Sequence, residues 1–236
     1  MRCTAPLSEG RSSRRAVLPA PRSAKMAFDP CAACGPPMNV IGFCGYSGSG
    51  KTTLVEQLIV RLKLAGQRVS VVKHAHHAFD IDHEGKDSWR HRRAGAFEVV
   101  IASNRRLAKI REFEVRADPT VHQLIAELVD CDWVLVEGFK RAALPKIEIW
   151  RAALARPAQY PHDPHVVAIC TDSPQQLPAP TALPLLDLND AEAVAAFLLR
   201  DAARFEYGAP QRLHAVSGDV VDERRLAALV PCPTAP

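Results

Sequence analysis

Eight consecutive residues have the types and the spacing that bind a chain of phosphates. They are Gly45, Tyr46, Ser47, Gly48, Ser49, Gly50, Lys51 and Thr52, and they match the pattern G-x-x-x-x-G-K-[ST]. Glycines let backbone N–H groups wrap a phosphate, and the helix that follows adds partial positive charge at its N-terminus. Lys51 should reach the β and γ phosphates, and Thr52 should place its hydroxyl on Mg²⁺. These residues, with the adjacent Thr53, predict a nucleotide-binding phosphate loop.

Glu137 follows the apolar run WVLV at residues 133–136. A carboxylate in this place would emerge at the carboxyl edge of a parallel sheet, beside the phosphate loop. The position suits a Mg²⁺ ligand, bound directly or through water. The alternative is a solvated acid at a strand end.

Asp172 follows another apolar run, VVAIC at residues 166–170, with Thr171 between them. A carboxylate can accept hydrogen bonds from guanine N1–H and N2–H, a pair that adenine does not offer. Asp172 is therefore the candidate that would select GTP over ATP. A turn-forming aspartate before Ser173 and Pro174 is the alternative.

The polar segment after Lys73 is dense in histidine and arginine. Its histidines are His74, His76, His77, His83 and His91. Neutral imidazole is a common ligand of transition metals, but no cysteine accompanies these residues, which makes a transition-metal site the weaker hypothesis. Arg90, Arg92 and Arg93 on one expected helix suit either an anionic phosphate or a solvated basic face. Asp87 begins that helix and can serve as its N-cap.

The elements that must position these residues alternate between strands and helices. Strands are expected at 39–45, 68–73, 97–103, 107–112, 133–136, 146–150, 166–170 and 184–188, and helices at 51–65, from 87, at 119–129 and at 190–203. Pro119 should lie in the first turn of its helix, and Asp190 should cap the last one. Continuous apolar strands between helices indicate an α/β fold with a mostly parallel sheet and helices on both faces.

Composition and charge narrow the class of protein. The chain has 236 residues, of which 47% are hydrophobic and 24% charged, which suits one α/β domain with peripheral segments. Six bases and two acids in the first 38 residues account for the whole net charge of +4. The body is neutral, which argues against binding of duplex nucleic acid. No apolar run approaches the roughly 20 residues of a membrane span, so a soluble protein is expected.

These patterns divide the chain into three parts. Residues 1–38 form an Ala-, Pro- and Arg-rich leader expected to be disordered, 39–203 the phosphate-loop domain and 204–236 a tail without a clear pattern. Of seven cysteines, Cys44, Cys131 and Cys170 lie in apolar runs, as reduced thiols do, which favours the cytoplasm. The pair Cys31 and Cys34 lies in the leader without a second pair at zinc-site spacing.

The additional glycine, Gly48, gives the loop the form G-x-x-G-x-G-K-T, which resembles the SIMIBI class of P-loop proteins. That class includes dethiobiotin synthetases and nickel-delivery GTPases. The segment 73–96, LVEGFK at 135–140 and PKIE at 145–148 together resemble the molybdopterin-guanine dinucleotide biosynthesis protein B (MobB) family. The opening VIGF at 40–43 and the closing LDLND at 186–190 extend the resemblance over about residues 39–203.

This resemblance implies a P-loop NTPase fold that binds GTP and Mg²⁺ and hydrolyses GTP weakly. It implies a homodimer that assists attachment of GMP to molybdopterin by a partner guanylyltransferase, MobA. Lys73 would lie near the γ phosphate, and Asp87, or in its place Asp80 or Asp82, would face Mg²⁺. Molybdopterin itself is a further candidate ligand, with pterin or phosphate contacts from His76, His77, Arg90 and Arg93.

Two other functions fit the same loop. A metallochaperone GTPase would deliver nickel or zinc through the histidines, and its metal binding would be lost on substitution of His76 and His77. A small-molecule kinase would show nucleotide turnover that rises sharply when a phosphate acceptor is added. An adapter would respond only to a protein partner.

Overall fold

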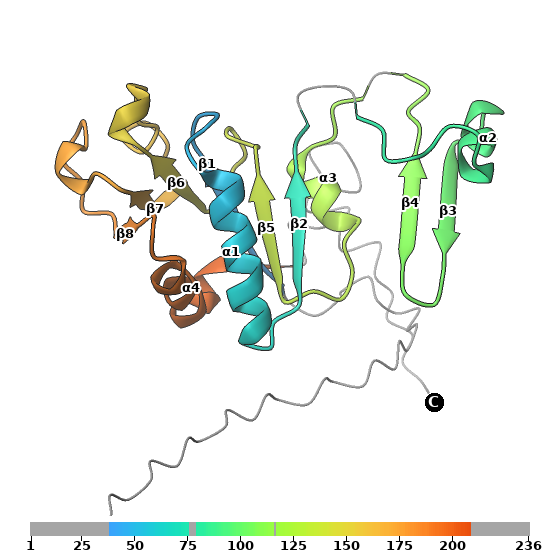
Figure 1. Ribbon diagram of the computed structural model, residues 1–236. Helices are drawn as coiled ribbons and strands as arrows, with labels where there is room; N and C mark the ends of the chain where they lie inside the picture. Colours follow the sequence, from blue (N-terminus) through green and yellow to red (C-terminus); the bar gives the residue numbers. More distant parts are fainter. Residues whose placement is uncertain (1–37, 76–78, 116, 209–236) are drawn as a thin grey trace, which may run out of the picture. The chain divides into compact units, whose positions relative to one another are not determined.

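The computed structural model describes residues 38–75, 79–115 and 117–208. The elements run in the order β1 (Met38–Cys44), α1 (Lys51–Leu64), β2 (Val69–Lys73), α2 (Asp87–Arg93), β3 (Glu98–Ala102), β4 (Leu107–Arg111), α3 (Val121–Ala126), β5 (Trp133–Glu137), β6 (Lys146–Trp150), β7 (Val166–Thr171), β8 (Leu185–Asp187), α4 (Ala191–Arg200) and β9 (Glu206–Tyr207) (Figure 1).

The main sheet has the strand order β2-β5-β1-β6-β7-β8. All five pairings along this path are parallel, and only β9 runs antiparallel, against β1. The mostly parallel sheet predicted from the apolar runs is therefore confirmed. Its strands end at a common carboxyl edge, the upper edge in Figure 1, where the segments that follow β1, β5, β6 and β7 gather.

Helices cover both faces of this sheet because alternate side chains of each strand point to opposite faces. On one face Ile41, Phe43 and Leu135 pack with Leu58 of α1 and Leu198 of α4. On the other face, side chains at alternate positions of the same strands, Val40, Val134 and Val136, pack with Val121 and Ile125 of α3. Near-continuous apolar strands are thus explained by burial on both sides.

Strands β3 and β4 form a separate two-stranded antiparallel sheet. Only residues 103–106 connect them, whereas a parallel crossover needs a dozen or more residues. The turn is closed by a hydrogen bond from the Ser103 N–H to the Arg106 carbonyl at 2.8 Å. Val100 and Leu107 are 56% and 67% exposed on this hairpin. It is thus an appendage to the parallel sheet.

Helix boundaries follow their caps. Asp190 caps α4 as predicted, with its carboxylate accepting from the Ala193 N–H at 2.9 Å. The prediction for α3 was wrong in detail, because Thr120 caps it through a reciprocal pair of hydrogen bonds with Gln123, and Pro119 lies before the cap instead of in the first turn. The helix also ends at Ala126, short of the predicted residue 129.

The described fold continues past the predicted domain end at residue 203. Phe205 is 1% exposed and its ring lies 5.8 Å from that of Trp133. Strand β9 then pairs Tyr207 with Met38, the first described residue. The predictions for residues 1–37 and 209–236, including the pair Cys31 and Cys34, lie outside the described residues.

Cys44, Cys131 and Cys170 are buried free thiols, as predicted. Burial raises the pKa of Cys44 and of Cys170 to about 12, which keeps both protonated and unreactive. None of the helices within the described ranges is long and apolar enough to cross a membrane.

Candidate functional site

The phosphate loop joins β1 to α1, which is the context that the motif requires. Gly45, Gly48 and Gly50 have φ angles of 139°, 79° and 97°, in the region that favours glycine. A Cβ atom on Gly45 would lie 2.4 Å from the Ile149 carbonyl oxygen, so no side chain fits there. Gly50 is the N-cap of α1, and the loop therefore delivers its backbone directly to a helix N-terminus.

Lys51 folds back over its own loop. Its ammonium donates to the Tyr46 carbonyl at 2.6 Å. Burial lowers the pKa of Lys51, and the nearby carboxylate of Glu137 partly opposes this shift. Ser49 is fully buried beneath the loop, and its hydroxyl makes no hydrogen bond within the described structure. Ser47 and Thr53, which precede and follow Ser49 in the chain, are exposed.

The carboxylate of Glu137 contacts both Thr52 and Lys73. The Thr52 hydroxyl donates to Glu137 Oε1 at 2.7 Å, and Lys73 Nζ lies 3.6 Å from Glu137 Oε2. The register of β2 on β5 places Lys73 directly beside Glu137. Glu137 is 8% exposed, so this is a built arrangement and not a solvated strand end. A hydroxyl and a carboxylate oxygen are ligands that suit Mg²⁺, which completes its shell with water and phosphate oxygens.

Asp172 follows β7, two strands away from the phosphate loop. It accepts from the Ser173 hydroxyl at 2.8 Å, and its Oδ2 lies 3.5 Å from Nε of Arg151, an ion pair without hydrogen-bond geometry. Arg151 also approaches the loop, because a Cβ atom on Gly50 would lie 3.6 Å from its Nη2. Arg151 was not among the predicted site residues, although it directly follows a predicted strand, a signal similar to the one that identified Asp172.

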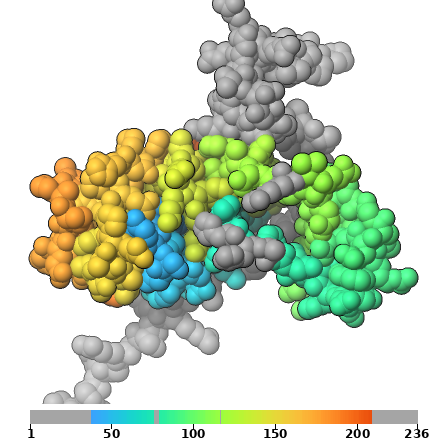
Figure 2. All heavy atoms as spheres, turned by 90° about the horizontal axis from the view of Figure 1, so that it is seen from above, coloured from blue at the N-terminus to red at the C-terminus, as the bar shows by residue number. Residues whose placement is uncertain are grey.

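Figure 2 looks down on this carboxyl edge. The blue segment that contains the phosphate loop lies beside yellow segments of the chain that follow β5 and β6. Residues of five parallel strands or the turns after them therefore surround one region: Lys73, Glu137, the phosphate loop, Arg151 and Asp172.

The other predicted site residues are not brought to this region by any contact in the described structure. The Asp87 side chain is 88% exposed and lies 3.7 Å from Arg90. Arg93 lies 5.6 Å from the centre of the Trp89 ring. The N-cap of α2 is Lys86, so the interpretation of Asp87 as an N-cap was wrong. His76 and His77 lie outside the described residues.

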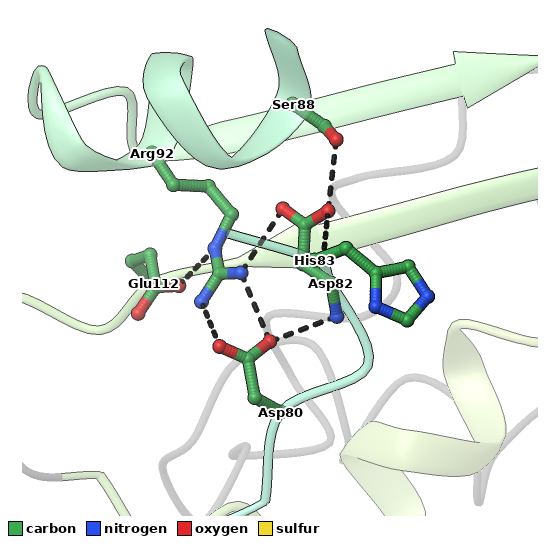
Figure 3. Close-up of polar contacts among 6 residues, drawn as sticks. All are labelled: Asp80, Asp82, His83, Ser88, Arg92 and Glu112. Atoms are coloured by element: carbon green, nitrogen blue, oxygen red, sulfur yellow. Dashed lines mark hydrogen bonds and ion pairs between the residues drawn. The ribbon is translucent and has the colours of Figure 1, made fainter. Parts of the chain in front are cut away.

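Arg92 instead organises the segment before α2 (Figure 3). Its guanidinium lies 3.0 Å from Asp80, 3.1 Å from Asp82 and 2.6 Å from Glu112. Ser88 of α2 adds a hydrogen bond to Asp82 at 2.9 Å. Hydrogen bonds from the Asp82 N–H and from Arg92 hold the pKa of Asp80 below its ordinary value. The two alternatives to Asp87 as magnesium ligands are thus engaged by an arginine.

We expect Arg92→Ala to speed amide hydrogen exchange across residues 80–83 and α2, because three carboxylates lose their common cation and then repel one another. Arg90→Ala, which removes a cation 71% exposed on the same helix, is the matched control and should leave exchange unchanged. As the pH falls through the depressed pKa of Asp80, its protonation should loosen the same segment less than Arg92→Ala does, because Asp82 and Glu112 still bind Arg92. Equal exchange in both variants would contradict this role for Arg92.

A transition-metal site was the weaker hypothesis for the histidines. Among residues 38–75, 79–115 and 117–208, no group of three His, Cys, Asp or Glu side chains is arranged to hold a metal ion. His74 lies against the Phe139 ring, with centroids 5.0 Å apart.

Known proteins are similar to this chain in sequence and in fold. The family model for molybdopterin guanine dinucleotide synthesis protein B, MobB, matches residues 40–172. The molybdopterin-guanine dinucleotide biosynthesis adapter protein of Haemophilus influenzae is 41% identical over 161 residues, which cover 67% of this chain and 86% of that protein. The adapter protein of Escherichia coli is 38% identical over 164 residues, which cover 68% of this chain and 91% of that protein. The crystal structure of a MobB homolog from Bacillus stearothermophilus superposes with a TM-score of 0.52 at 25% identity. The superposition covers 71% of this chain and 99% of that homolog.

The matched segment runs from β1 to Asp172 and so includes the phosphate loop, Lys73 and Glu137. The two adapter proteins match over most of their own lengths. By its sequence, its parallel sheet and its phosphate loop, this chain belongs to the MobB family.

Proposed function

We propose that this protein is a GTP-binding adapter in the biosynthesis of molybdopterin guanine dinucleotide. The nucleotide part of this proposal rests on one observation. Thr52 contacts Glu137 beside a phosphate loop that contains three glycines with positive φ angles. The adapter part rests on the relatives, which are named adapter proteins of this biosynthesis.

Thr52 and Glu137 would hold the Mg²⁺ ion that accompanies the nucleotide. The ion would neutralise charge on the β and γ phosphates. Lys51 is poised to leave the Tyr46 carbonyl for these phosphates, because one hydrogen bond to a carbonyl is weaker than a bond to a charged oxygen. Lys73 would approach from the side of β2, where it already contacts Glu137.

The base would lie toward β7, where Asp172 is available. Its Oδ1 is held by Ser173, and its Oδ2 has only the longer contact with Arg151. A carboxylate oriented in this way can accept from guanine N1–H and N2–H. The nucleotide would then lie along the carboxyl edge, with its phosphates at β1 and β5 and its base at β7.

Hydrolysis by this site is expected to be weak. Glu137 is the one acid in direct contact with the phosphate-loop residues within the described structure, and Thr52 and Lys73 already engage both of its oxygens. Neither oxygen is therefore left to accept the proton of an attacking water. The energy of GTP binding would therefore serve assembly more than turnover.

The partner proposed for this assembly is the guanylyltransferase MobA, with molybdopterin as the shared ligand, in the reducing setting of the cytoplasm that three free thiols suit. A homodimer is also proposed. Its support is the separate β3–β4 hairpin, on which Val100, Ile101 and Leu107 are 56%, 42% and 67% exposed. Apolar side chains on an unpaired two-stranded sheet favour pairing with a second copy.

Asp172→Asn tests the base assignment and with it the preference for GTP. An asparagine amide donates where the carboxylate accepted, so it should weaken GTP binding by about 10- to 100-fold and improve binding of xanthosine triphosphate, whose C2 oxygen is an acceptor. Calorimetry in the presence of Mg²⁺, with ATP as the third ligand, measures all three affinities.

Asp190→Asn is the matched control, because it changes an aspartate whose carboxylate caps α4 and should leave nucleotide preference unchanged. Preferred ATP binding by the wild type would contradict the proposal and favour a kinase. The wild type should also raise the turnover of purified MobA. Stimulation by a small phosphate acceptor alone would contradict the adapter role.

A further inference from the structure

Three cations gather around Tyr46, the second residue of the phosphate loop. Lys51 donates to its backbone carbonyl at 2.6 Å. On its ring, Nζ of Lys140 lies 4.9 Å from the centroid and the guanidinium carbon of Arg156 lies 5.6 Å from it. An aromatic face attracts a cation, but it supplies no negative charge that would neutralise two.

Lys140 and Arg156 differ from their neighbours in their ion pairs. Lys73 pairs with Glu137 and Arg151 pairs with Asp172. Within the described ranges, neither Lys140 nor Arg156 lies within ion-pair distance of a carboxylate. Two cations at one ring, with no acid of the described ranges beside them, raise the positive potential around Tyr46, and that potential attracts an anion.

Strand β6 holds the backbone of both residues in place. Lys146, its first residue, is 2% exposed and donates to the carbonyl of Lys140 at 2.8 Å and to that of Ala142 at 2.9 Å. Trp150, its last residue, donates from its indole N–H to the carbonyl of Arg156 at 3.1 Å. Buried side chains at the two ends of one strand thus fix the two segments that carry the exposed cations.

We propose that Lys140 and Arg156, each in contact with the ring of Tyr46, form a phosphate-binding subsite in addition to Lys51. The proposal rests on the proposed function only in placing a nucleotide in the loop beneath. The phosphate has two possible sources by chemistry, the terminal phosphate of the bound nucleotide or the phosphomonoester of a second ligand. The guanidinium of Arg156 suits either, because it presents several donors to phosphate oxygens.

The test is the double variant Lys140→Ala with Arg156→Ala in the full chain. Calorimetry would measure GTP and GDP binding with Mg²⁺, and then binding of inorganic phosphate to the GDP-loaded protein. Loss of two charge-assisted contacts should weaken the affected ligand by about 10- to 100-fold. Weaker binding of GTP with unchanged binding of GDP would assign the subsite to the terminal phosphate of the nucleotide. A loss for inorganic phosphate with both nucleotides unchanged assigns it to a second ligand.

Arg200→Ala is the matched control, because Arg200 also lies over an aromatic ring, 5.8 Å from the centroid of Phe197. It should bind all three ligands as the wild type does. The proposal is overturned if the double variant also binds all three unchanged, or if Arg200→Ala weakens them equally. Trp150→Phe should keep the core packed and weaken the same ligand by a smaller factor, because Arg156 loses its backbone anchor.

The proposed function can fail separately. If the wild type binds no nucleotide, inorganic phosphate would be titrated into Lys51→Ala, in which the phosphate loop is disabled. Phosphate binding that then depends on Lys140 and Arg156 keeps the subsite and rejects the GTP-binding function. Phosphate binding that ignores both residues rejects the subsite as well.

Discussion

Lys51→Ala is expected to weaken GTP binding by at least about a hundredfold, because it removes the cation that the phosphate loop places against the β and γ phosphates. The fold should survive the change. The one hydrogen bond of the ammonium in the described structure goes to the Tyr46 carbonyl, and burial already disfavours its charge. Calorimetry with Mg²⁺ and GTP, beside a thermal melt of each protein without ligand, separates lost binding from lost structure.

Lys63→Ala is the matched control for this experiment. Lys63 lies in the last turn of the same helix, away from the phosphate loop, and is exposed. Its removal should change neither the GTP affinity nor the melting temperature by a measurable amount. GTP binding by Lys51→Ala at wild-type affinity would show that the loop is not the nucleotide site.

Local spacing explains which parts of this site could be predicted. The conformation of the phosphate loop depends on glycines at fixed positions before a helix, so the residues themselves encode it. Glu137 could be found because an acid that ends a buried strand must emerge at the carboxyl edge of a parallel sheet. The order of strands then decides its neighbours, and this order brought Lys73 and Thr52 to it.

Residues whose surroundings depend on distant parts of the chain were harder to predict. Arg92 reads as part of a basic helix face, but it binds acids 10, 12 and 20 positions away in the sequence. Lys140 and Arg156 meet at Tyr46 only because β6 lies beside β1. Single-sequence patterns do not report such contacts.

Two local features, in contrast, were present in the sequence and were overlooked. Thr120 and Gln123 have the spacing of a capping box, which places the helix start at residue 121. The three residues between the apolar runs at 97–103 and 107–112 are too few for a parallel crossover, so these runs could pair only as a hairpin.

Lys146→Met should lower the free energy of unfolding by about 3 kcal/mol, as expected when one partner of a buried ion pair is removed. The three donors of its ammonium are fully used, by the carbonyls of Lys140 and Ala142 and by Asp163 Oδ2 at 2.5 Å. Methionine keeps most of the volume beside Gly42, where packing is so close that an added Cβ would lie 2.7 Å from Lys146 Cγ. The loss would therefore come from unpaired polar groups and not from a cavity. Urea denaturation at neutral pH measures it.

The dependence of stability on pH in the acidic range distinguishes loss of the ion pair from loss of packing. Burial opposes ionisation of Asp163, but the hydrogen bond from Lys146 holds its pKa below the ordinary value. A lowered pKa contributes stability above the ordinary value and loses it as the pH falls through the folded value. Wild type should therefore lose stability on acidification more steeply than Lys146→Met.

Two further variants serve as controls. Asp163→Asn should restore part of the lost stability when it is combined with Lys146→Met. Lys140→Met changes an exposed lysine and should lower the free energy of unfolding by under about 0.5 kcal/mol. Parallel pH curves for wild type and Lys146→Met would show that packing, and not the charge of Lys146, anchors the segment that carries Lys140.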